Sequence, residues 1–107
     1  MNFMKMMKQA ADLQQRMQAK QEELATRTVE HSSGGGMVTA MARGDLSIVS
    51  IRVDPKVVDP SDVGLLEDLV LAAVNGALQS AREMVAREMA ALAQSAGLPA
   101  GLKLPFT

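Results

Sequence analysis

The sequence contains no cysteine, tryptophan or tyrosine, and it has only two phenylalanines and one histidine among its 107 residues. The absence of cysteine excludes disulfides, thiolate zinc ligands and a cysteine nucleophile. The shortage of aromatic side chains removes the largest apolar groups available to a core. Leucine, valine, alanine and nine methionines remain to do the packing. We therefore expect the chain to complete its core with a second copy of itself.

Long hydrophobic runs are also missing. No segment approaches the roughly 18 consecutive apolar residues that would span a membrane. The N-terminal segment contains lysines but has neither the apolar stretch nor the small-residue cleavage site of a signal peptide. We therefore expect a soluble cytoplasmic protein without a membrane partner. A chain of this length is expected to form one domain, over residues 1–107.

Positive and negative residues are nearly equal in number, with 11 Lys and Arg and 12 Asp and Glu, and the net charge is −1. The total by itself does not predict nucleic-acid binding, and the distribution is more informative. Residues 1–20 carry Asp12 alone against four cations, Lys5, Lys8, Arg16 and Lys20. Residues 54–68 are acidic, with Lys56 as their only cation. On charge distribution alone, both segments are interpreted as ordinary solvated surfaces.

Residues 3–27 predict one helix, because the segment lacks glycine and proline and consists mainly of good helix formers. Its apolar residues recur at spacings of three and four, which favours a narrow seam for contact with another helix. They are Phe3, Met6, Ala10, Leu13, Met17 and Leu24. Lys20 occupies the one position of this series that is not apolar.

Three short strands are predicted next, at residues 28–32, 37–43 and 46–53. The glycine run at 34–36 and the pair Gly44-Asp45 separate them as turns. The alternation of the third strand slips between Ile48 and Val49, which predicts a β-bulge there. Strands joined by such short turns form an antiparallel meander.

A second helix is expected from about Gly64 or Leu65 to about Ala96, with Ser61 or Asp62 as its N-cap. Gly97 and Pro99 end it, and residues 98–107 should form an extended tail. About 30 helical residues measure ~45 Å, which is too long for this chain to cover alone. Small residues in the middle of the helix allow close approach, so we predict a homodimer built through the strands and through Ala73, Gly76, Ala77 and Ala81 of this helix. The fold class is α+β, in the order helix, three strands, helix.

The sequence contains almost no candidate catalytic groups. His31 has no second histidine or cysteine with which to hold a metal. Glu67-Asp68 suits the start of a helix through the helix dipole, and the glycine run fits no phosphate-binding motif. We therefore expect no enzyme, no metal, no cofactor and no small-molecule substrate.

Several segments together resemble a known family. The first helix carries MKMMKQAADLQQRMQ, the third strand ends in IRVDP, the second helix opens with LEDLVLAAVNGALQSA, and the C-terminal segment contains LKLPF. This arrangement resembles the YbaB/EbfC family of nucleoid-associated proteins. The resemblance implies an αβββα protomer with projecting helical arms and a tweezer-like homodimer. It also implies binding of double-stranded DNA with weak sequence preference in the nucleoid, where the protein would influence nucleoid organisation and gene expression.

If the chain binds DNA, the cations spaced about one helical turn apart on the first helix supply a mechanism. Phosphate contacts release condensed counterions and give affinity without reading bases. We expect the contacts at Lys5, Lys8, Arg16 and Lys20, with Arg82 and Arg87 of the second helix as weaker candidates because Glu83 and Glu88 accompany them. The alternative is a protein-interaction module whose methionine-rich arm holds a partner protein, because methionine adapts to varied apolar surfaces.

Overall fold

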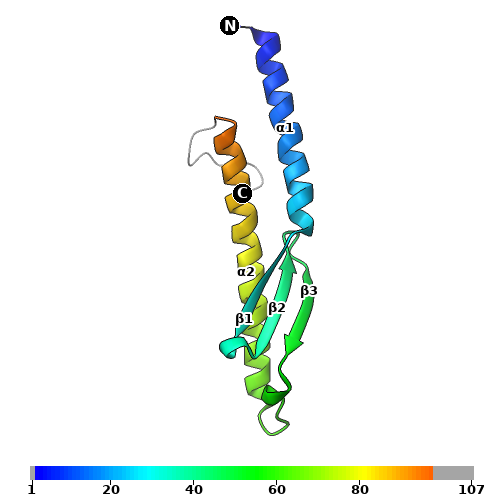
Figure 1. Cartoon of the computed structure of the whole chain (residues 1–107), viewed down its shortest axis with the longest axis vertical. Helices are drawn as coiled ribbons and strands as arrows, with labels where there is room; N and C mark the ends of the chain where they lie inside the picture. The colour runs from blue at the N-terminus through cyan, green and yellow to red at the C-terminus, as the bar shows by residue number, and fades with distance from the viewer. Residues whose placement is uncertain (1, 98–107) are drawn as a thin grey trace.

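The computed structural model describes residues 2–97, which form an elongated molecule measuring 72 × 22 × 17 Å (Figure 1). Helix α1 (Phe3–Thr26) leads into a three-stranded antiparallel sheet, and helix α2 (Val63–Ser95) follows it. This arrangement confirms the predicted α+β class and the order αβββα. The extended tail predicted for residues 98–107 lies outside the described residues.

Each helix begins at a side chain that accepts a hydrogen bond from its first turn. The Asn2 side chain accepts from the Lys5 backbone N–H at 3.3 Å, and Asp62 accepts from that of Leu65 at 3.3 Å. Such caps satisfy N–H groups that the helix itself leaves unpaired. Asp62 is therefore the N-cap of α2, one of the two residues expected in this role, and α2 begins one residue earlier than predicted.

The sheet has the order β1-β2-β3, with β1 at Thr28–Ser33, β2 at Val38–Arg43 and β3 at Ile48–Val53. The register shifts opposite Met41 and Ala42, whose partners on β3 are Ser50 and Ile48. Val49 is thus an extra residue on β3, and the bulge predicted from the slipped alternation is confirmed. Two short 3-10 turns complete the chain, η1 (Gly34–Gly36) and η2 (Pro55–Val57).

The η1 turn explains the run of three glycines. All three have positive φ, at 59°, 66° and 94°, a region that residues with a Cβ rarely adopt. The run is therefore a turn between β1 and β2, as its position before a strand predicted.

Helix α2 packs along one face of the sheet, mainly over β1 and β2 (Figure 1). Small side chains meet on both sides of this contact and are fully buried, namely Ala73, Ala77 and Ala81 from α2 with Val38, Ala40 and Ala42 from β2. Because alanine takes little space, the helix can lie close to the strands. The two helices run in opposite directions, and the first half of α1 projects past the end of α2 (Figure 1).

Candidate nucleic-acid interface

The projecting half of α1 forms an arm with no buried residue. Every residue from Asn2 to Asp12 is exposed, and Leu24 is the only buried side chain of the helix. Fractional exposure reaches 70% at Phe3 and 75% at Met4. The seam predicted for helix-on-helix contact is therefore used only over its C-terminal part, where Leu13 and Met17 are partly buried and Leu24 is buried. Within residues 2–97, the N-terminal end of α1 is therefore exposed for contact with another molecule.

Three of the predicted cations lie on one side of this arm. At about 100° per residue, Lys5, Lys8 and Arg16 fall within an arc of about 80° on the helix surface. All three are exposed, and none of them forms an ion pair within the part of the chain that the structure describes. Asp12 lies in the same arc and interrupts it. Lys5, Lys8 and Arg16 are called the cationic stripe below.

The inner edge of the stripe borders a groove between α1 and the end of α2. The groove has a volume of about 390 Å³ and is lined by Gln9, Ala10, Asp12, Leu13, Arg16, Ser95 and Ala96. Two of these residues, Asp12 and Arg16, carry charge. Arg16 is therefore placed where α1 begins to separate from α2, whereas Lys5 and Lys8 lie further out on the arm.

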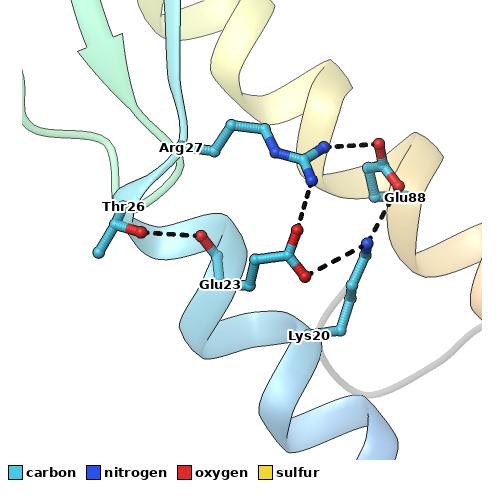
Figure 2. A network of polar contacts seen from close by, with 5 residues as sticks. All are labelled: Lys20, Glu23, Thr26, Arg27 and Glu88. Carbon is cyan, nitrogen blue, oxygen red and sulfur yellow. Dashed lines mark hydrogen bonds and ion pairs between the residues drawn. The ribbon is translucent and has the colours of Figure 1, made fainter.

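Lys20 has a different environment from the other predicted contacts (Figure 2). Its Nζ lies 3.5 Å from Glu23 Oε2 and 3.5 Å from Glu88 Oε2. The same two carboxylates bind Arg27, whose Nη2 is 2.5 Å from Glu23 Oε1 and whose Nη1 is 2.7 Å from Glu88 Oε1. Lys20 thus already forms ion pairs with two carboxylates of its own chain. It is therefore a weaker candidate for a phosphate contact than the residues of the stripe.

These contacts shift the pKa values of the two long-range partners. The hydrogen bond from Arg27 and the positive charge of Lys20 hold the pKa of Glu88 below its ordinary value. The hydrogen bonds to Glu88 and Glu23 raise the pKa of Arg27 further above its already high value. Glu88 and Arg27 are therefore both charged at neutral pH.

Arg82 and Arg87 do not form one face with each other. Both are exposed on α2, but five residues separate them by about 140° around the helix. One straight duplex lying along α2 could therefore contact only one of the two.

The small residues predicted to form a dimer interface are already covered by the same chain. Ala73, Ala77 and Ala81 are 0% exposed beneath the sheet. Gly76 faces β1, and a Cβ added there would overlap the imidazole ring of His31. The small side chains of these residues allow α2 to pack closely on the sheet of the same protomer. They therefore have no exposed surface with which to contact a partner. This corrects the predicted interface.

Apolar surface is instead exposed where α2 leaves β3 uncovered. Ile51 and Val53 pair with Ala40 and Val38, so they lie on the face of the sheet that α2 occupies. The β2 residues are fully buried, but Ile51 is 44% and Val53 36% exposed. This surface, called the β3 face below, was not singled out from the sequence, since alternation does not reveal how far a helix extends over a sheet.

No metal-binding arrangement is found among residues 2–97, where no group of three or more His, Asp or Glu side chains could hold an ion. Over the same residues, neither helix combines the length and the apolarity needed to cross a bilayer.

The fold and the arm define a small α+β protein in which a cationic helix projects from a helix-backed sheet. Residues 1–96 match the YbaB/EbfC DNA-binding family. The chain is 52% identical over 98 residues to nucleoid-associated protein TTE0040 of Caldanaerobacter subterraneus, covering 92% of this chain and 88% of that protein. It is 48% identical over 99 residues to a nucleoid-associated protein of Syntrophobacter fumaroxidans, covering 92% and 89%. The chain belongs to the YbaB/EbfC DNA-binding family.

The fold has a counterpart among solved structures. The crystal structure of protein HP0035 from Helicobacter pylori superposes with a TM-score of 0.59 at 18% identity, covering 74% of this chain and 92% of that one. At this identity the likeness shows the fold alone. The family and the names of the bacterial relatives point to a nucleoid-associated DNA-binding protein and not to an enzyme.

Proposed function

We propose that this chain binds duplex DNA as a homodimer, mainly through phosphate contacts of the cationic stripe, with weak sequence preference. The observation that carries the proposal is the stripe itself: Lys5, Lys8 and Arg16 lie exposed on one side of α1, which projects from the body at its N-terminal end. Ammonium and guanidinium groups on a helix match the spaced phosphates of a duplex backbone. Membership of a DNA-binding family supports the same partner. The protein would act in the nucleoid and influence its organisation and gene expression.

Weak sequence preference follows from the kinds of side chain on the arm. Between the cations lie methionine, glutamine, alanine, Leu13 and Asp12, and the arm has Phe3 as its single aromatic residue. Lysine contacts to phosphate position a protein without carrying sequence information. Successive bases of a single strand would need several aromatic platforms. The arm therefore suits duplex DNA better than single strands.

The test is a titration of unrelated duplexes at several salt concentrations. Two arms with three cations each provide six contacts at most, so log affinity should fall with log salt at a slope between about −3 and −5. The slope should be similar for duplexes of different sequence. A slope near zero, or binding confined to one sequence, would contradict the proposal.

A homodimer is proposed because the β3 face is an incomplete core. Ile51 and Val53 expose apolar surface on the side where α2 stops covering the sheet. A second copy placed there would bury this surface, and such burial is favourable by about 25 cal/mol per Å² of apolar area. The dimer would also supply the second arm, which doubles the number of phosphate contacts.

Ile51→Glu should convert the dimer into monomer, because it places a charge in the middle of the β3 face. Sedimentation at micromolar concentration should give twice the 11.4 kDa mass for the parent and a lower mass for the variant. Ser50→Glu is the matched control, since Ser50 lies on the opposite face of the same strand and should leave the dimer intact. A parent protein that sediments as a folded monomer would remove the homodimer from the proposal.

A second candidate function rests on the apolar side of the arm. Phe3, Met4, Met6 and Met7 are each at least 50% exposed, and methionine-rich surfaces bind varied apolar helices. The arm would then hold a partner protein. Capture of an apolar helical peptide that is insensitive to salt, without duplex binding, would favour this function over DNA binding.

A further inference from the structure

The direction of the arm is determined over a short part of α1. Leu24 is 1% exposed and is the only buried residue of the helix, whereas every residue from Asn2 to Asp12 is exposed. From Leu24 to Lys5 the helix measures roughly 30 Å. A rotation of about 10° at the base would therefore move Lys5 by roughly 5 Å, a large displacement for a phosphate contact.

At this base, four side chains form a closed ring of alternating charge (Figure 2). Glu23 and Glu88 each contact both Lys20 and Arg27, at distances from 2.5 to 3.5 Å. Three members belong to the end of α1 and the residue after it, whereas Glu88 belongs to α2. Every cation is held from two directions, so the ring restricts rotation of α1 more than a single pair would.

The geometry points to a positioning role: the ring of Lys20, Glu23, Arg27 and Glu88 sets the angle between α1 and α2 and so holds the cationic stripe in place for DNA. This inference rests on the proposed function for its DNA part. A role in attracting phosphate does not explain the ring, because its two carboxylates cancel its two cations. Its members are 26–52% exposed, and a single ion pair at such exposure adds little to stability. A network of several charges, in which each cation bridges two carboxylates, restricts geometry more effectively than one pair.

The two explanations predict opposite signs for Glu88→Ala. Removal of a negative charge should strengthen DNA binding if the residue acts only through long-range electrostatics. If the ring positions the arm, we expect affinity to fall roughly fivefold at low salt. Glu83→Ala is the matched control on the same helix, because Glu83 accepts a hydrogen bond from Gln79 of α2 and forms no ion pair among the described residues. This variant should bind DNA as well as the parent or better. Glu88→Asp keeps the charge and should retain most of the affinity.

The arm angle can be measured without DNA. Because the chain has no cysteine, spin labels can be placed at Gln14→Cys on α1 and Ala72→Cys on α2, both exposed positions. Dilution with unlabelled protein isolates the distance within one protomer. The distribution should be narrow in the parent, in Glu83→Ala and in Glu88→Asp, and broad or shifted in Glu88→Ala. Glu23→Ala provides a second variant with the same expectation should Glu88→Ala lose its helical circular dichroism.

Each outcome decides the inference. A broadened distribution with weakened binding supports it. An unchanged distribution in folded Glu88→Ala and Glu23→Ala overturns it, and so does a broadened distribution with DNA binding equal to or tighter than that of the parent. If the parent does not bind DNA, the proposed function fails, and the distance measurement alone decides whether the ring sets the angle.

Discussion

Lys5→Glu combined with Lys8→Glu is expected to lower affinity for duplex DNA by more than about tenfold at low salt. Both side chains lie exposed on the projecting part of α1. In a homodimer the double substitution reverses charge at four places, and each lost phosphate contact lowers the magnitude of the salt slope by about 0.9. Helical circular dichroism should not change, because glutamate forms helices about as well as lysine.

The control for this variant carries the same change of net charge at the other end of the molecule. Arg52→Glu with Lys56→Glu alters exposed residues on and just after β3, and its affinity should be reduced far less. Neutralising acidic residues there is a poorer control, because Asp62 caps α2 and its loss would cost about 1 kcal/mol of stability. Within the arc of the stripe, Asp12→Asn should strengthen binding, since it removes the one negative charge among the cations.

Binding by the double lysine variant that equals the parent would contradict the proposed interface. The cationic stripe would then be an ordinary solvated surface. The apolar side of the same arm, with Phe3 and Met4, would become the leading candidate, and capture of a partner peptide would be the next measurement.

The elements of the fold could be predicted from local sequence because each has a local cause. The three-and-four spacing of apolar residues predicted α1, and the glycine run predicted the turn at η1. The slip in the alternation at Ile48 and Val49 predicted the bulge on β3. The cap at Asp62 followed from the preference of helix starts for short polar side chains. Each of these signals lies within a few residues of the feature it determines.

The site was less predictable, because it depends on which surfaces meet. The row of small residues Ala73, Ala77 and Ala81 predicts close packing against a neighbour. It does not indicate whether that neighbour is a second chain or the sheet of the same chain. Likewise, Lys20 stood out as the one charged residue in an apolar series, yet its partner Glu88 is remote in sequence. The contact of Arg27 with Glu88 spans 61 residues, and only the Lys20–Glu23 and Glu23–Arg27 pairs have the spacings of three and four that indicate local contacts.

The second large effect is expected at the base of the arm, where Gly44→Ala should destabilise the protein by about 2 kcal/mol. A Cβ at Gly44 would overlap the backbone carbonyl of Leu24 and lie 3.2 Å from Val85 Cγ2. The Gly44 N–H also donates to the Arg27 carbonyl at 3.0 Å, and the Arg27 N–H donates to that of Leu24 at 3.1 Å. These bonds fix the turn against the end of α1, so the clash cannot be relieved by rotating a side chain.

Thermal unfolding followed by circular dichroism, at one fixed protein concentration, measures the effect. A loss of 2 kcal/mol corresponds to a decrease in Tm of about 10 °C for a domain of this size. Gly64→Ala provides the same substitution where nothing lies within 4 Å of the added Cβ, in the first turn of α2. There alanine should leave Tm unchanged or raise it, by at most about 1 kcal/mol of added stability, because it favours the helix over glycine. Equal Tm values for the two variants would show that the turn at Gly44 does not hold α1, and that the arm is fixed by Leu24 and the charged ring alone.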